Sequence, residues 1–226
     1  MRIQAIAVAL LCAGLFVVLL YALNQVRKPS KWFGRIFLWI MNVSHSGVTD
    51  WGLKHVRIEE QFTILDVGCG GGRTVEKLAG VATGGKIFGV DYAKGSVAAA
   101  RGRNSRLIEE GRVEIIRAAV SQLPFSDEKF DLVTAVETQY YWPDLVGDMR
   151  EILRVLKPGG TLIVIAESYA KRAEKNSELS VKKRVRYTEL GAEEERDLFT
   201  RAGYVDIQIF EEGGKGWICA VGKKAL

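Results

Sequence analysis

A ten-residue stretch, ILDVGCGGGR at positions 64–73, joins an apolar run to a turn that contains four glycines. Such a turn lets the backbone approach a ligand closely, because no Cβ atom intervenes. Asp66 lies just before the turn, and Asp91 ends the next apolar run, KIFGVD. A carboxylate beside the turn repels a pyrophosphate and attracts a cationic ligand, and a second carboxylate can accept both hydroxyls of a ribose. The two acids therefore predict a site for a cationic nucleoside.

Other nucleotide-binding motifs fit this stretch less well. A dinucleotide fingerprint counted from Gly68 requires a small residue at position 73, where the chain has Arg73, and a Gly-Lys-Ser/Thr phosphate loop is absent. A cationic adenosyl group attached to a ribose describes S-adenosylmethionine, which we expect as the cofactor. The three cysteines and two histidines are far apart and form no ligand pattern, so we expect no metal site.

The chain resembles class I S-adenosylmethionine-dependent methyltransferases, especially the small-molecule branch that includes quinone and sterol methyltransferases. The resemblance covers about residues 41–222 and implies methyl transfer from S-adenosylmethionine on a seven-stranded sheet with a reversed hairpin at its edge. It rests on five segments in the family's order: ILDVGCGGGR, GVDYAKGSV, AAVSQLPF, FDLVTAVE and LRVLKPGGTLIVI.

The resemblance also implies roles for individual positions. Gly68, Gly70 and Gly72 surround the methionine moiety, Asp66 lies near its ammonium group, and Asp91 binds the ribose. The rest of the expected cofactor set consists of Cys69, Tyr92, Val120, Ser121 and Val136.

Two adenine contacts have alternatives. Tyr92 either stacks against the adenine or is an ordinary surface aromatic residue. Ala119 stands where the family often has an aspartate before the adenine segment. The adenine amino group then depends on backbone groups near Val120 or on Ser121.

The candidate catalytic residues are Glu137, Tyr141 and His45. A base is needed only if the acceptor arrives protonated. Glu137 follows the fourth strand run, where its carboxylate among aromatic faces could take a proton or attract a cationic acceptor. The alternative is that Glu137 bonds to backbone at the strand end while the aromatic residues pack under the next helix.

His45 belongs to MNVSHSGVTDWGLKHV, which precedes the sheet as the cofactor lid does in related small-molecule enzymes. We expect Ser46, Asp50 and Trp51 of this segment to line the acceptor pocket with it. A structural role for His45 is the alternative to a role as base.

Short apolar runs alternate with helical patterns from residue 61 onward, which predicts a doubly wound, Rossmann-like α/β fold with a mainly parallel sheet. EEGGKG separates the last two runs and predicts a hairpin with one antiparallel strand. The strand runs are 62–67, 86–90, 112–116, 130–136, 160–166, 205–210 and 217–221, and the helical stretches are about 73–79, 95–109, 144–156 and 189–202. We expect Pro158-Gly159-Gly160 to end the third of these helices.

The N-terminus carries an uncharged, mostly apolar run from Ile3 to Leu23. As a helix it would be about 31 Å long, close to one bilayer core. A cleaved signal peptide is the alternative, but its apolar region is shorter and is followed by small residues. Cations after the run place the following domain in the cytoplasm. The predicted organisation is a transmembrane anchor at 1–26, a juxtamembrane segment and lid at 27–60, and the methyltransferase domain at 61–226.

The formal charge of +5 is concentrated in residues 1–35 and 171–186, each of which sums to +5, so the remainder sums to −5. The positive charge is confined to two segments, whereas a uniformly basic nucleic-acid-binding protein would carry it throughout the chain. We therefore expect no nucleic-acid partner. Segment 171–186 either faces anionic headgroups or is a solvated loop. The anchor favours a lipid, quinone or other membrane-dissolved acceptor, or a small molecule such as an amine. The competing functions are a nucleic-acid or protein methyltransferase and a non-catalytic adenosyl-binding scaffold.

Overall fold

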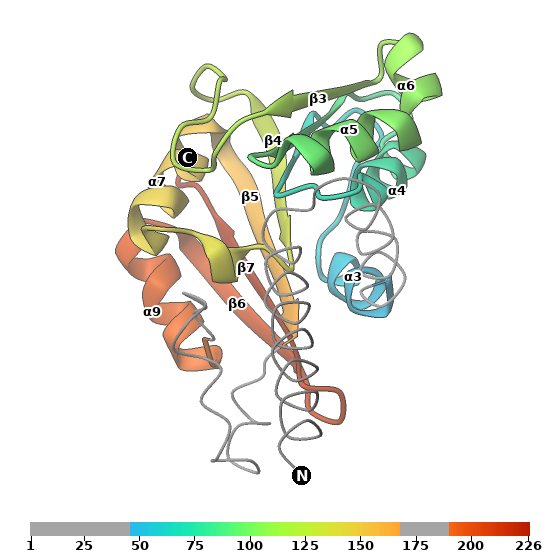
Figure 1. Cartoon of the computed structure of the whole chain (residues 1–226). Helices are drawn as coiled ribbons and strands as arrows, with labels where there is room; N and C mark the ends of the chain where they lie inside the picture. Colours follow the sequence, from blue (N-terminus) through green and yellow to red (C-terminus); the bar gives the residue numbers. More distant parts are fainter. Residues whose placement is uncertain (1–45, 168–189) are drawn as a thin grey trace, which may run out of the picture.

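Seven strands form one sheet within residues 46–167 and 190–226, the parts of the chain that the computed structural model describes (Figure 1). They are β1 (Ile64–Val67), β2 (Ile87–Asp91), β3 (Val113–Arg117), β4 (Phe130–Val136), β5 (Leu156–Glu167), β6 (Val205–Glu212) and β7 (Trp217–Lys223). Their order across the sheet is β3-β2-β1-β4-β5-β7-β6. β1 to β5 are parallel, and β7 is antiparallel to both β5 and β6. The predicted Rossmann-like sheet and its reversed hairpin are confirmed.

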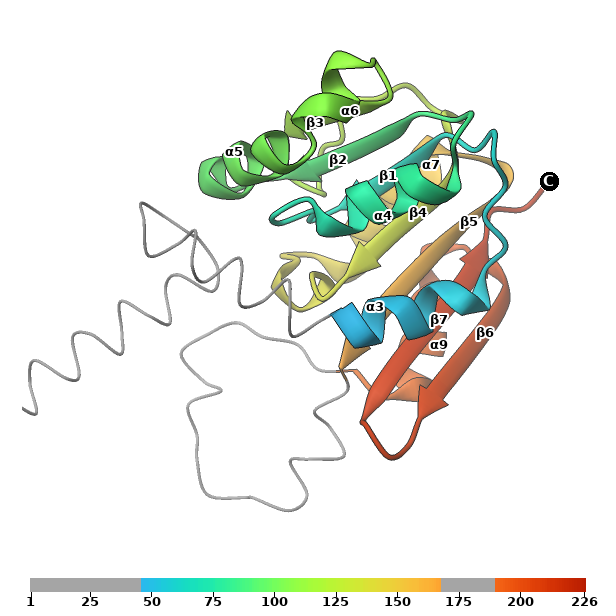
Figure 2. The same ribbon diagram turned by 90° about the vertical axis from the view of Figure 1, so that its right-hand side faces the viewer.

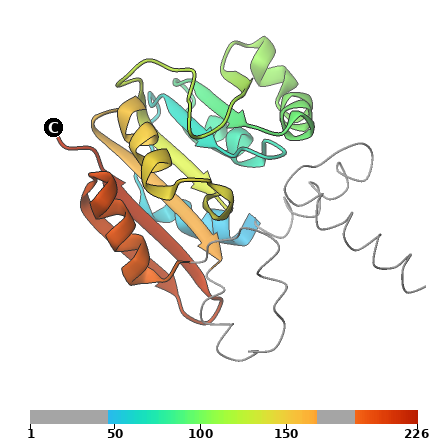
Figure 3. The same cartoon turned by 60° about the vertical axis from the view of Figure 1, so that its left-hand side comes forward.

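Helices cover both faces of this sheet, as Figures 2 and 3 show from opposite sides. The elements on one face are α3 (Ser46–Gly52), η1 (Leu53–His55), α4 (Arg73–Val81), α5 (Lys94–Arg103) and α6 (Ser105–Glu109). Those on the other are α7 (Leu145–Val155) and α9 (Ala192–Ala202), and the short η2 (Gln139–Tyr141) follows β4. Because both faces are covered, all four residues of β1 are buried, with Ile64 in one apolar cluster and Leu65 in the other.

The segment predicted as one helix over 95–109 is two helices with a break at Asn104. The Asn104 side chain donates to the carbonyl oxygens of Ala100 at 2.9 Å and Gly72 at 3.0 Å. An asparagine amide that bonds to nearby backbone offers an alternative to the helical ladder, which accounts for the break. The same amide fastens α5 to the glycine turn.

Helix α7 ends at Val155, before the Pro158-Gly159-Gly160 sequence that was expected to end it. Its N-terminus is capped by Asp144, whose Oδ1 accepts the Gly147 N–H at 3.1 Å. β5 begins directly at Leu156, and the proline and glycines lie inside the strand, where its register against β4 shifts. A Pro-Gly-Gly sequence is compatible with such an irregularity because proline donates no ladder bond.

Helix α3 packs on β5 and β7. Gly52 permits this approach, because a Cβ there would lie 2.6 Å from the Ile165 side chain.

The predicted anchor at 1–26 and residues 27–45 lie outside the described residues. Among the helices within 46–167 and 190–226, none has the length and apolar character to cross a membrane.

Candidate functional site

A cavity of about 320 Å³ opens at the carboxyl ends of β1, β2 and β4. This is the edge where open α/β sheets bind ligands. It is lined by Val67, Gly68, Gly70, Val90, Asp91, Tyr92, Ser96, Ala118, Ala119, Val120, Ser121, Glu137, Thr138, Tyr141, Trp142 and Pro143. Segments far apart in the sequence therefore meet at one place, and most of the predicted site residues are among them.

The glycine turn forms the floor of the cavity in a conformation that favours glycine. Gly68, Gly70 and Gly72 have φ angles of 71°, 51° and 79°, which other L-residues rarely adopt. The N–H groups of Gly68 and Cys69 both donate to the Val90 carbonyl oxygen, at 2.8 and 2.9 Å. A Cβ on Gly68 would overlap the Thr138 side chain. The turn is thus pinned to β2 and leaves no room for a larger residue at its first position.

Asp91 lines the cavity and also holds the glycine turn. Its Oδ2 accepts the Gly70 N–H at 3.1 Å and its Oδ1 accepts the Ala93 N–H at 2.8 Å. Burial raises the pKa of Asp91, while these bonds and one from the Ser96 side chain oppose the rise. A carboxylate at this strand end keeps lone pairs that can accept ribose hydroxyls.

Asp66 lies behind the turn rather than among the residues that line the cavity. It is 2% exposed, and its Oδ1 accepts the Thr134 hydroxyl at 2.6 Å. Burial raises the pKa of Asp66 to about 7, with the Thr134 bond opposing and the charge of Asp91 adding to the rise. The predicted contact of Asp66 with a ligand ammonium group stays a prediction.

The adenine side of the predicted site is a mostly apolar wall. Ala118, Ala119, Val120 and Ser121 line it, and Ser121 is the one of these four with a polar side chain. Tyr92 also lines the cavity while 39% of its surface is exposed. This position suits a ring that covers one face of a ligand, and it is compatible with the stacking role that the resemblance implies.

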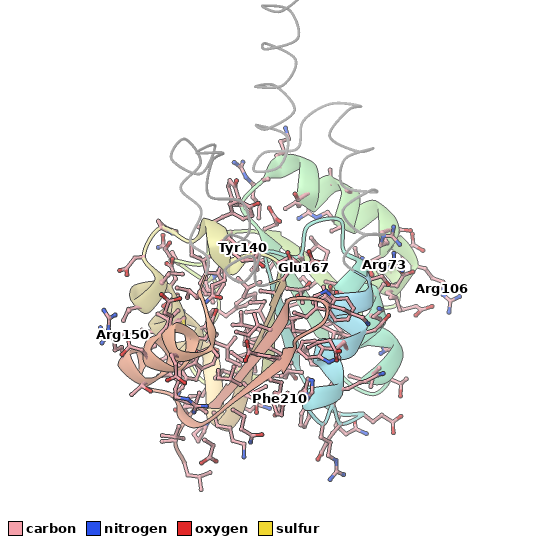
Figure 4. The ribbon with its side chains drawn as sticks, turned by 90° about the horizontal axis from the view of Figure 1, so that it is seen from below. Arg73, Arg106, Tyr140, Arg150, Glu167 and Phe210 are labelled. Atoms are coloured by element: carbon pink, nitrogen blue, oxygen red, sulfur yellow. The ribbon has the colours of Figure 1, made fainter. Side chains whose placement is uncertain are left out.

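Glu137 occupies the opposite wall with an unusual backbone. Its φ is 54°, and its Oε1 accepts the Glu167 N–H at 2.6 Å and the Tyr140 hydroxyl at 3.4 Å. Tyr140 also donates to the Glu167 carbonyl oxygen at 3.0 Å, and the two residues lie close together in Figure 4. Burial raises the pKa of Glu137 to about 7, against the bond from the Glu167 N–H. Both interpretations of Glu137 thus find support, since the carboxyl group bonds to backbone and also lines the cavity.

The short helix η2 carries Tyr141 to the cavity and is tied to α9 from behind. Gln139 Nε2 donates to Glu195 Oε2 at 3.3 Å, and both side chains are buried. Burial raises the pKa of Glu195 to about 7, although the bond from Gln139 opposes the rise. This buried pair connects the wall of the cavity to the helix layer.

Several predicted residues lie elsewhere. Cys69 is buried under the turn, where burial raises the pKa of its thiol well above the usual value, so it is a packing residue rather than an exposed nucleophile. Gly72 caps α4 and packs on Asn104. Val136 packs against an apolar cluster and does not line the cavity. His45 lies outside the described residues.

Ser46, Asp50 and Trp51 are not among the described residues that line this cavity, and their expected role in an acceptor pocket stays a prediction. The Ser46 hydroxyl accepts a bond from Arg73 at 2.9 Å, and Asp50 is paired with Lys77. The ring centroid of Trp51 lies 5.9 Å from that of Trp217 on β7, because α3 packs over β5 and β7 rather than over the glycine turn.

Sequence reasoning missed Thr138 and Ser96 as lining residues. Ser96 occupies the first turn of α5, close behind Asp91, and a hydroxyl at that spacing from a strand-end acid is a signal that could have been used. Thr138 has no such signal, since its contact with Gly68 depends on how β4 lies beside β1. No group of three or more potential metal ligands occurs in the described ranges.

Comparison with known proteins gives a consistent pattern. Residues 65–164 match the family model described as a methyltransferase domain. The sterol 4-C-methyltransferase strm-1 of Caenorhabditis elegans is 34% identical over 111 residues, which is 49% of this chain and 33% of that protein. The demethylmenaquinone methyltransferase of Oceanobacillus iheyensis is 29% identical over 117 residues, which is 51% of this chain and 49% of that protein. The match thus spans between a third and a half of the length of these relatives.

Among solved structures, phosphoethanolamine N-methyltransferase 2 of Haemonchus contortus, in complex with S-adenosyl-L-methionine, aligns with a TM-score of 0.64. Its sequence identity is 16%, and the alignment covers 80% of this chain and 53% of that one. At this identity the likeness concerns the fold.

Proposed function

We propose a function for the whole protein from the premise that the chain carries a class I S-adenosylmethionine-dependent methyltransferase domain, to which residues 65–164 belong. The protein transfers a methyl group from S-adenosylmethionine to a small or membrane-dissolved organic acceptor. The observation that carries the proposal is the chemistry of the cavity wall, which combines a bare glycine turn with acids and aromatic rings.

The charges around the cavity fit this cofactor. Asp91 and Glu137 are the charged side chains among the described residues that line it, and lysine and arginine are absent from that set. A diphosphate would meet carboxylates without a cation to offset its charge, whereas a sulfonium is attracted to them. The lack of a Cβ atom at Gly70 leaves the backbone there open to close approach by a ligand, whereas the corresponding space beside Gly68 is filled by the Thr138 side chain.

When bound, S-adenosylmethionine supplies a methyl group on a cationic sulfur atom. The contribution of the chain is to hold the acceptor in line with that group and to keep water away, and such positioning can account for much of a rate enhancement. Asp91 orients the ribose and, through the Gly70 N–H, the turn beneath it. Tyr141, Trp142 and Pro143 give the acceptor side an apolar and aromatic wall.

Glu137 is our candidate for the group that takes a proton from an acceptor that arrives protonated. A pKa of about 7 suits a base at neutral pH. Tyr141 is the candidate for contact with the acceptor, because it lines the same wall. His45 remains a prediction from the sequence.

A membrane-dissolved acceptor such as a lipid or quinone is the finer part of the proposal. Support comes from the sterol and menaquinone methyltransferases to which the chain is similar, and from the apolar run Ile3–Leu23. We place the catalytic domain on the cytoplasmic side of a single span, since four cations follow that run within a dozen residues.

Calorimetry on the full chain in detergent tests the cofactor. S-adenosylmethionine and S-adenosylhomocysteine should bind, and Asp91→Ala should weaken both at least about tenfold. Glu110→Ala is the matched control, because it removes an exposed acid that precedes the amino end of β3 and does not line the cavity. Binding of a nicotinamide or flavin nucleotide, without affinity for either adenosyl compound, would overturn the proposal.

A second assay tests the acceptor. The full chain is incubated with methyl-labelled cofactor and lipid extract, and labelled lipid is expected with the wild type and not with Asp91→Ala. If label passes only to water-soluble amines, the membrane-dissolved acceptor is wrong while methyl transfer itself stands.

A further inference from the structure

A second hollow lies beside the cavity at the strand ends, between the start of α7 and one face of α9. It encloses about 700 Å³ and is lined by residues 142–146 and by side chains of α9. Figure 3 shows the two helices side by side on one face of the sheet, where they pack against each other. Trp142 and Pro143 line both this hollow and the cavity, so one segment of chain borders the two. We name the hollow the α7–α9 groove.

The floor of the α7–α9 groove is apolar. It consists of Trp142, Pro143, Leu145, Val146, Leu190 and Leu198. Trp142 and Leu198 are buried. Leu145, Val146 and Leu190 are only partly buried, and they leave apolar surface in contact with water. A ligand that covers this surface removes it from water, which favours binding, so the floor suits the apolar body of a ligand.

Carboxylates dominate the rim of the groove. They belong to Asp144, Glu193, Glu194 and Asp197, and Arg201 supplies the one cation of the described lining. Arg201 Nη1 lies 3.4 Å from Asp197 Oδ2, so its charge is directed at that acid. Four carboxylates and one guanidinium give the lining a formal charge of −3. Because like charges close together repel, a cation in the groove is favoured and an anion is disfavoured.

Two of the rim acids are fixed by the turns that they cap. Asp144 Oδ1 accepts the Gly147 N–H at 3.1 Å at the start of α7. Glu194 Oε2 accepts the Gly191 N–H at 2.7 Å at the start of α9. Neither acid forms an ion pair with a residue that the structure describes, and Glu193 does not either. The groove thus holds three carboxylates without a cationic partner in the described ranges.

A ligand with a cationic group and an apolar body matches both parts of the groove. Its body covers the floor while its charge lies among the rim carboxylates. An anionic ligand would be repelled by the rim, and an uncharged quinone would gain only from the floor. The cavity has the same sign of charge, since Asp91 and Glu137 line it without a lysine or arginine among the described residues. Both hollows therefore favour a ligand that carries positive charge.

We propose that the α7–α9 groove binds the part of the methyl acceptor that lies away from the reacting atom, and that this acceptor is an amine-bearing lipid with a net positive charge. The inference rests on the proposed function, because the groove borders the cavity through Trp142 and Pro143. It selects one class among the lipid, quinone and amine acceptors. It also gives Glu193 and Asp197, which lie outside the cavity lining, a role in specificity.

Calorimetry on the full chain in detergent tests the charge preference of the groove, with S-adenosylhomocysteine present at saturation. The probes are 2-phenylethylamine, 2-phenylethanol and 3-phenylpropanoate, which share an apolar ring and differ in charge. The wild type should bind the amine about fivefold more tightly than the alcohol at low salt, and the carboxylate least. In about 1 M sodium chloride, where the Debye length is about 3 Å, this preference should disappear.

The double variant Glu193→Gln with Asp197→Asn tests the rim. Both side chains are exposed, so the substitutions remove charge without opening the core. The variant should bind the amine and the alcohol about equally, and it should bind S-adenosylhomocysteine as the wild type does. Glu109→Gln with Glu110→Gln is the matched control, because it removes two exposed acids at the end of α6, on the opposite face of the sheet. The control should keep the wild-type preference.

The same variants test the acceptor when methyl-labelled cofactor and lipid extract are supplied. The labelled lipid should carry a net positive charge and be retained on a cation-exchange resin. The double variant should need about fivefold more extract for half-maximal labelling, with an unchanged maximal rate, because the groove lies away from the reacting atom. The control variant should need as much extract as the wild type.

Equal affinity of the wild type for the amine and the alcohol, or an amine preference that persists in the double variant, would overturn the inference. So would a labelled lipid that the resin does not retain, or an extract requirement that the double variant leaves unchanged. Tighter amine binding after glutamine replaces the lysines and arginines of residues 171–186 would assign the groove to that segment and overturn it as well. Absence of S-adenosylhomocysteine binding by the wild type would remove the proposed function, whereas the other outcomes leave it standing.

Discussion

The buried pair of Glu195 and Gln139 makes the stability of the fold depend on pH in a calculable way. Burial raises the pKa of the Glu195 carboxyl from its ordinary 4.5 to about 7. The folded state therefore holds a proton on Glu195 at pH values where the unfolded chain has lost it. For a raised carboxyl, the contribution to stability is greatest at low pH and is lost as pH rises from 4.5 to about 7.

The size of this effect follows from the two pKa values. At 1.36 kcal/mol per pH unit, the interval from 4.5 to about 7 corresponds to about 3 kcal/mol, most of which falls between pH 5 and pH 8. Glu195→Gln abolishes the titration while it keeps an oxygen that can accept the Gln139 amide. The free energy of unfolding of the variant, relative to the wild type, should thus increase by about 2 to 3 kcal/mol from pH 5 to pH 8.

Urea titrations of the full chain in detergent, at half-unit pH steps, measure this difference. The informative quantity is how the difference in unfolding free energy between the variant and the wild type changes with pH. A constant difference at all pH values is not informative, because the new amide nitrogen of the Glu195→Gln variant can lack a hydrogen-bond partner and so destabilise the fold equally at every pH. Glu193→Gln is the matched control, since its side chain is exposed on the same turn of α9. Parallel curves for Glu195→Gln and the wild type would refute the reasoning, for they would show that Glu195 ionises alike in both states.

Two further predictions concern the cavity floor. Gly68→Ala should abolish S-adenosylhomocysteine binding in calorimetry and sharply lower the free energy of unfolding, because its Cβ would overlap Thr138. Gly70→Ala should lower the free energy of unfolding by only about 1 kcal/mol, since its Cβ meets no crowding protein atom; equal losses of unfolding free energy in the two variants would contradict this. Thr134→Val should lower the free energy of unfolding at pH 8 by about 1–3 kcal/mol, because it leaves the buried Asp66 carboxylate without its donor; an unchanged urea midpoint would argue against that bond.

Much of the fold could be predicted from the sequence because its strands are short, buried on both faces and separated by helical patterns. β1 illustrates this, since ILDV reads as a continuous buried strand and all four residues are buried. The hairpin of β6 and β7 follows from the short glycine-containing connection between them.

The candidate site likewise contains some features that local sequence predicts and others that depend on tertiary contacts. The glycine turn and Asp91 carry their chemistry in local sequence, and the structure brings both to one cavity. Asp66 is recognisable as an acid, but its orientation depends on Thr134, which is 68 residues away on a neighbouring strand.

The surface on which α3 packs also depends on tertiary contacts. The sequence of α3 does not indicate which strands it contacts, and the need for glycine at position 52 is apparent only once Ile165 is seen to lie beside it. Local patterns thus identify which groups can do chemistry, whereas the neighbouring strands decide which way those groups face.

Position 137 places two requirements in opposition. Its left-handed backbone, with a φ of 54°, is one that glycine adopts without strain, whereas an L-residue there costs about 1 kcal/mol or more. The carboxyl group that joins the ends of β4 and β5 requires that a side chain be present. A glycine at position 137 would therefore relieve the backbone strain but remove the carboxyl group that accepts the Glu167 N–H, so one bond between the two strand ends is obtained at the expense of a strained residue.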